Sequence, residues 1–174
     1  MTFFGTVLGI FIVIALASWI IGYNALIKYL NWVEESWEQV EVQIKRQFDL
    51  IPELVDTAQP HMRHEQALLE KLLELRGGLD SRKQSRAEIV DADEALSASL
   101  RSVFDKKQDN EGLQGNEDFE RLEALFMESE AKLDKAKRVY NNTVTKYNLK
   151  IQSIPTRFVA DAHNFHSRET VHIP

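Results

Sequence analysis

Residues 2–27 read TFFGTVLGIFIVIALASWIIGYNALI and contain no Asp, Glu, Lys, Arg or His. At about 1.5 Å per residue, a helix of this length crosses the roughly 30 Å hydrocarbon core of a bilayer. Its apolar centre, residues 7–21, ends near Trp19 and Tyr23, amphipathic aromatic residues that favour the headgroup level. We therefore predict a transmembrane anchor over residues 1–27.

A cleaved signal peptide is the alternative interpretation of this segment. Ala15, Leu16 and Ala17 resemble a cleavage site, but no Lys or Arg precedes the apolar run as it does in secretory signals. A retained anchor is therefore favoured.

Two pairs of small residues are spaced four apart in the anchor, Gly5 with Gly9 and Ser18 with Gly22. This spacing lets two helix backbones approach closely within lipid. Small residues are also common in spans that do not associate, so the pattern is compatible with a monomer. We predict membrane self-association through these four residues.

The remaining sequence favours long helices, because only four Pro and seven Gly occur in 174 residues. An apolar stripe with helical spacing continues from the anchor and comprises Leu26, Leu30, Val33, Trp37, Val40, Ile44, Phe48, Ile51 and Val55. The anchor helix is expected to continue unbroken to about residue 51, a length of roughly 70 Å. Pro52 is expected to kink or end it.

Three further helices are predicted. Pro60 suits the first turn of the second, which stops at Gly77 and Gly78. The third covers residues 86–105, and after a polar loop the fourth runs to Pro155.

These elements predict an all-α protein whose N-terminal transmembrane helix continues into an elongated antiparallel up-down four-helix bundle. The expected parts are the anchor at 1–27, the bundle at 28–155 and a C-terminal tail at 156–174.

Charge is unevenly distributed along the chain. The net charge of −6 gives no general attraction to nucleic acids. Residues 131–157 nevertheless hold seven Lys or Arg against one Asp. In an up-down bundle the fourth helix returns to the membrane, which would bring Lys146, Lys150 and Arg157 to anionic headgroups. An equally weighted alternative is that this helix pairs with acidic neighbouring helices.

Three stretches carry a family resemblance: YNALIKYLNWVEESWEQVEVQIKRQFDLIPELVDT at 23–57, His64-Glu65, and YNNTVTKYNLKIQSIPTRFVAD at 140–161. In these residues the chain resembles the LemA family. The sequence departs from the family pattern in DKKQDNEGLQGNED at 105–118 and in the polar ending HNFHSRETVHIP. The resemblance implies a membrane-anchored helical bundle, in a family with a member linked to building bacterial membrane organelles, and it implies no catalytic residue.

The matching positions also predict a polar layer between helices. Tyr140 and Tyr147 lie seven apart on the fourth helix, with Asn141 and Asn148 beside them. Buried Tyr and Asn side chains need hydrogen-bond partners. The first helix could supply these partners through Gln43, Arg46 and Asp49. A packing role is favoured over ligand binding, because polar layers commonly specify helix register.

No constellation of residues predicts catalysis, a cofactor or a metal. The chain has no Cys, which excludes thiol catalysis and thiolate metal sites. His61 with His64, and His163 with His166, are spaced three apart, but Leu68 stands where a zinc protease motif needs its second His. We therefore expect the protein not to be an enzyme.

The leading functional hypothesis is a membrane scaffold that homo-oligomerises and shapes or organises the bilayer. Its motivation is the long helix with Tyr29, Trp32 and Trp37 just outside the membrane. The alternative is a membrane-tethered adaptor that binds an unidentified protein on the bundle. The family resemblance implies a bacterial protein, so we expect a single-pass inner-membrane protein. Because Lys28 directly follows the span, we expect its soluble domain to be cytoplasmic.

Overall fold

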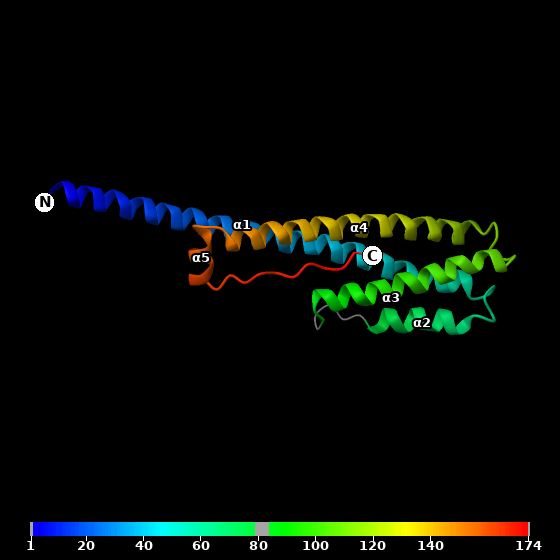
Figure 1. The fold of residues 1–174 in the computed structure, drawn as a ribbon. Helices are drawn as coiled ribbons and strands as arrows, with labels where there is room; N and C mark the ends of the chain where they lie inside the picture. The colour runs from blue at the N-terminus through cyan, green and yellow to red at the C-terminus, as the bar shows by residue number, and fades with distance from the viewer. Residues whose placement is uncertain (1, 79–83, 174) are drawn as a thin grey trace. The chain divides into compact units, whose positions relative to one another are not determined.

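The structure is a computed structural model that describes residues 2–78 and 84–173. Within these ranges every regular element is a helix, which confirms the all-α prediction (Figure 1). The elements are α1 (Thr2–Ala58), α2 (Gln66–Gly78), α3 (Arg86–Asp105), the 3₁₀ turn η1 (Lys106–Asp109), α4 (Glu117–Gln152) and α5 (Thr156–Ala162).

The apolar N-terminal segment and the predicted first bundle helix form one 57-residue helix, α1. The stripe expected to face inward is buried at Leu26, Val33, Trp37, Val40 and Ile44. The prediction that the helix continues unbroken from the apolar segment is therefore confirmed.

Of the two outcomes predicted for Pro52, an end of the helix is wrong, because α1 continues through this proline to Ala58, whereas a kink stays a prediction. An interior proline removes one backbone donor and costs about 3 kcal/mol. The turns around Pro52 bury four side chains that offset this cost, since a buried aliphatic side chain contributes about 1.5–3 kcal/mol. These residues are Ile51, Leu54, Val55 and Ala58.

The predicted start of the second helix at Pro60 is also wrong. Pro60 lies in a turn in which the backbone N–H groups of His61 and Met62 both donate to the Ala58 carbonyl. This turn places Met62 in the core, and α2 begins at Gln66. The third predicted helix matches α3, which starts with a capping box between Ser85 and Glu88.

The described chain divides into two compact units. Of the described residues, unit 1 comprises 2–38 and 138–170, and unit 2 comprises 39–78, 84–137 and 171–173. Both α1 and α4 contribute residues to each unit. The antiparallel up-down arrangement of a four-helix bundle stays a prediction.

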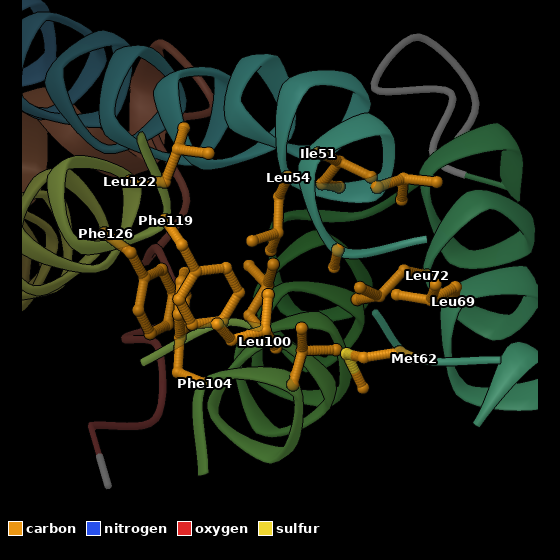
Figure 2. Close-up of a cluster of buried hydrophobic side chains, with 14 of the residues drawn as sticks. Ile51, Leu54, Met62, Leu69, Leu72, Leu100, Phe104, Phe119, Leu122 and Phe126 are labelled. Atoms are coloured by element: carbon orange, nitrogen blue, oxygen red, sulfur yellow. The ribbon is translucent and has the colours of Figure 1, made fainter. Parts of the chain in front are cut away.

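Unit 2 is built around one apolar core to which α1, α2, α3 and α4 all contribute (Figure 2). Phe104 of α3 stacks on Phe126 of α4 with ring centroids 5.4 Å apart and lies 5.3 Å from Phe119. Leu54, at the centre of the same cluster, is fully buried. The core thus encloses the part of α1 that follows Pro52.

Unit 1 contains the remaining lengths of α1 and α4, together with α5 and most of the tail. Its small apolar cluster consists of Leu26 of α1 with Val159 and Ala160 of α5. Farther along, Trp37 and Tyr140 pack with their ring centroids 5.4 Å apart. The segment after α4 is therefore structured, and α5 docks on α1.

Candidate functional site

The N-terminal part of α1 exposes apolar side chains around its whole circumference. Of the most apolar 18-residue stretch, nothing is buried within the protein. In unit 1 these turns extend past α4 and α5 (Figure 1). A helix that is apolar on every side needs lipid or protein around it. Among the described residues, α1 is the one helix long and apolar enough to span a membrane.

The exposed stretch ends where α5 packs against α1. Gly22 is buried there, and a Cβ atom on it would lie 3.3 Å from Val159 Cγ2 and 3.4 Å from Thr156 Cγ2. Glycine thus permits the close approach of α5. Gly22, predicted to mediate self-association, is occupied by a contact within its own chain.

The other predicted small residues lie differently. Nothing approaches within 4 Å of where a Cβ atom would stand on Gly5 or Gly9, and Ser18 is half-buried. At about 100° per residue, Ser18 and Gly22 are on a different side of α1 from Gly5 and Gly9. The four residues therefore do not form one face.

The end of α5 is held by aromatic residues of α1. The His163 ring lies 4.8 Å from the Tyr23 ring and 5.9 Å from the Trp19 ring, measured between centroids. Phe165 packs edge-on against Tyr23 at 6.0 Å. His163, considered above as a metal ligand, thus lies in an aromatic contact.

The tail is then fastened along α4. Asn148 donates from Nδ2 to the Arg168 carbonyl at 2.8 Å and accepts from the Arg168 backbone N–H at 2.9 Å. The Tyr140 hydroxyl donates to the Glu169 carbonyl at 3.0 Å. Burial raises the pKa of Tyr147 on the same face of the helix, and the Arg168 charge acts in the opposite direction. Tyr140 and Asn148 therefore bind the tail.

This tail contact differs from the predicted polar layer. Gln43, Arg46 and Asp49 were expected to supply the partners of the tyrosines and asparagines. Arg46 instead donates to Gln43 at 3.4 Å on an exposed surface, and Asp49 is exposed in the same unit. Asn141, the remaining predicted member, is half-buried on α4.

Unit 2 contains a polar cluster that the sequence analysis did not identify. Asp93 of α3 is 1% exposed and Lys137 of α4 is 2% exposed, and their Oδ2 and Nζ atoms are 3.5 Å apart. Gln47 of α1 is fully buried and accepts a hydrogen bond from the Ser97 hydroxyl at 3.0 Å. Three helices thus contribute a charged or amide side chain to one buried site.

These side chains line a cleft of about 450 Å³ that also includes Arg101, Glu130 and Asp134. Within the described part of the chain, Asp93 Oδ1 and Gln47 Nε2 have no hydrogen-bond partner. Burial raises the pKa of Asp93 to about 6, while the Lys137 charge and hydrogen bond lower it and the Glu94 and Glu130 charges raise it further. The net shift shows that burial outweighs the ion pair.

A sequence signal for this cluster existed. Gln47 lies between Ile44 and Ile51, at steps of three and four within the buried stripe of α1. Asp93 and Lys137 hold equivalent positions in the stripes of their helices. A polar residue on an apolar stripe predicts a buried interaction.

The three basic residues predicted near the membrane belong to unit 1. Lys146 is exposed, Lys150 is half-buried, and Arg157 Nε lies 3.9 Å from Asp161 on α5. The Lys150 carbonyl accepts a hydrogen bond from the Thr156 hydroxyl at 2.6 Å, which fixes the start of α5.

In the described ranges, no three His, Cys, Asp or Glu side chains are grouped so that they could hold a metal ion. His61, from the other histidine pair, lies against Gly112, where a Cβ atom would stand 2.2 Å from His61 Nδ1.

A comparison with protein families matches residues 36–174 to the LemA family. The chain belongs to the LemA family. The match covers most of this LemA protein and includes α5 and the tail, whereas the exposed apolar part of α1 precedes it. A search of the curated proteins finds no match to the chain.

The first prediction concerns the buried pair. Asp93→Leu leaves the Lys137 ammonium buried without its carboxylate, which is expected to cost about 3–5 kcal/mol. The double variant Asp93→Leu/Lys137→Met should recover most of this loss in chemical unfolding of the full chain. The exposed pair Lys132–Glu128 of α4, which lies outside this cleft, is the control, and its removal should cost less than about 1 kcal/mol. Additive losses in the double variant would contradict the coupling.

The second prediction concerns pH. Asp93 binds its proton more tightly in the folded than in the unfolded state, so its contribution to stability is greatest at low pH. That contribution should fall as pH rises from about 4 to about 6, between the ordinary pKa of 3.8 and the folded value. The stability of wild type relative to Asp93→Asn should decline over this window and then level off. A relative stability that rises with pH would show that the Lys137 interaction dominates.

The third prediction concerns the tail. Asn148→Ala removes two hydrogen bonds, each contributing about 1 kcal/mol. Amide exchange of residues 165–171, followed by mass spectrometry, should accelerate. Asn142→Ala, at an exposed position of the same helix, should leave this exchange unchanged. Equal exchange in both variants would mean that the tail is held by other contacts.

Proposed function

We propose that this LemA protein is a membrane-anchored helical scaffold that homo-oligomerises at the bilayer and shapes or organises it. The observation that carries the proposal is the fully exposed apolar stretch of α1, which continues without interruption into the folded units. Twelve Leu, Ile, Val or Phe side chains lie between residues 3 and 21, and each favours the membrane centre by about 0.3–0.6 kcal/mol. No charged side chain in this range opposes insertion.

The packing of α5 supports retention of the segment as an anchor. Cleavage after Ala17 would remove the turns of α1 that precede Ser18. The new end of the helix would then lie next to Gly22, where α5 docks. A helix that supports tertiary contacts directly after its apolar part favours an anchor over a signal peptide.

The exposed small residues support self-association. Gly5 and Gly9 leave open space on one side of the helix, as close helix–helix contacts require. Just outside the apolar stretch, Trp32 is 40% exposed and packs edge-on against Tyr29 at 5.1 Å. Both features are suited to contacts between copies of the chain.

A structural role is further supported by the buried cluster of unit 2. A buried Lys–Asp pair with a nearby Gln can specify how helices align, because misaligned helices would bury these groups singly. We infer that the protein is not an enzyme and acts through lipid and protein contacts, with no role in nucleic-acid binding.

The fourth prediction tests the oligomer. Gly5→Leu/Gly9→Leu should lower the mass of the gently extracted protein in mass photometry, because the side chains fill the space for a second helix. Ala15→Leu/Ala17→Leu is the control, since it also enlarges two small side chains, each about 100° around the helix from the glycines. An unchanged mass would place the contact elsewhere, and a monomeric wild type would favour an adaptor.

The fifth prediction concerns orientation. We propose a single-pass bacterial inner-membrane protein with its folded units in the cytoplasm, because Lys28 directly follows the apolar segment. Met127→Cys and Gln108→Cys, at exposed positions in a Cys-free chain, should resist an impermeant maleimide on intact cells until lysis. Labelling of both on intact cells would reverse the orientation.

A further inference from the structure

The position of α5 along α1 is set by two contacts. Thr156 and Val159 pack on Gly22, and the His163 ring lies against Trp19 and Tyr23. The apolar residues 3–21, whose end is at this contact, measure about 28 Å as a helix, close to the thickness of a hydrocarbon core. If these residues span the bilayer, α5 lies at the headgroup level.

The surface of α5 has three sides. Thr156, Val159 and Ala160 are buried against the protein. At about 100° per residue, Arg157 and Asp161 share a second, exposed side. Pro155, Phe158 and Ala162 share the third, which is exposed and apolar.

Two large apolar side chains are exposed at the junction between α4 and α5, which we call the α4–α5 corner. Ile154, next to the start of α5, is 76% exposed, and Phe158 is 61% exposed. Exposed aromatic and aliphatic residues beside basic ones are typical of segments that lie in the membrane interface. Lys150 and Arg157 supply the basic charge here and fit anionic headgroups.

We propose that the α4–α5 corner is a second membrane contact, in which Ile154 and Phe158 insert into the interface of the same bilayer that α1 spans. The inference rests on the proposed membrane anchor and adds a monotopic contact to it. Its partner is a lipid surface with anionic headgroups. The corner would then fix the rotation and tilt of α1, because α5 can meet the bilayer on one side of that helix only.

The Cys-free chain allows a direct test. An environment-sensitive fluorophore is attached to the full-length protein at one introduced cysteine at a time. The four single variants are Ile12→Cys, Phe158→Cys, Asp161→Cys and Met127→Cys. The protein is reconstituted in nanodiscs of phosphatidylethanolamine and phosphatidylglycerol that contain lipids spin-labelled near the headgroup or deep in the chain. Asp161 is on the polar side of α5, and Met127, 63% exposed in unit 2, matches the exposure of Phe158.

Ile12→Cys should be quenched best by the deep label and Phe158→Cys by the shallow label. Emission from the fluorophore on Phe158→Cys should shift to the blue. The fluorophore on Asp161→Cys should be quenched less than that on Phe158→Cys, and the fluorescence of Met127→Cys should be the same with and without spin-labelled lipid. If Ile12→Cys is quenched but Phe158→Cys behaves like Met127→Cys or Asp161→Cys, the corner contact is wrong and the anchor stands. A blue shift at Phe158→Cys without lipid quenching indicates a protein cover and also overturns it. Absence of quenching at Ile12→Cys overturns the anchor itself.

Discussion

One helix, α1, has to satisfy two different surroundings along its length. Its first turns are apolar on every side, and its later turns are apolar along one stripe only. The hydrophobic effect acts on both parts, but the first part needs an external apolar medium, whereas the second is covered by the chain's own helices. The change between the two occurs at Gly22, where α5 first covers the helix. Both compact units depend on this helix for part of their core.

Helix identity could be predicted from the sequence because the apolar spacing is regular. The apolar stripe predicts the bounds of α3, and the structure adds a capping box between Ser85 and Glu88 at its start. The helix end predicted at Pro52 is wrong because the sequence shows only the backbone donor that proline removes. The burial of neighbouring side chains, which offsets that cost, depends on the tertiary structure. The same holds for Pro60, whose turn is stabilised by the burial of Met62.

The site could be predicted only in part, since the choice of partner depends on tertiary structure. Tyr140 and Asn148 were recognised as needing hydrogen bonds, and the structure supplies these from the tail. The polar C-terminal sequence contains no pattern that predicts such a contact. Asp93 and Lys137 interrupt apolar stripes, which is a readable signal of burial, although their pairing across 44 positions of sequence requires the fold. Apolar periodicity thus predicts elements better than it predicts which of their polar groups meet.

The fastening of the tail has a mechanical consequence. From α5 the chain runs back along α4, reaching Asn148 through Arg168 and Tyr140 through Glu169. A sideways force on the apolar end of α1 therefore passes from α5 into α4 by two parallel routes, the covalent corner after Gln152 and the hydrogen-bonded tail. Shared loading resists bending more than a single hinge does. Unit 1 is thus braced as a closed loop.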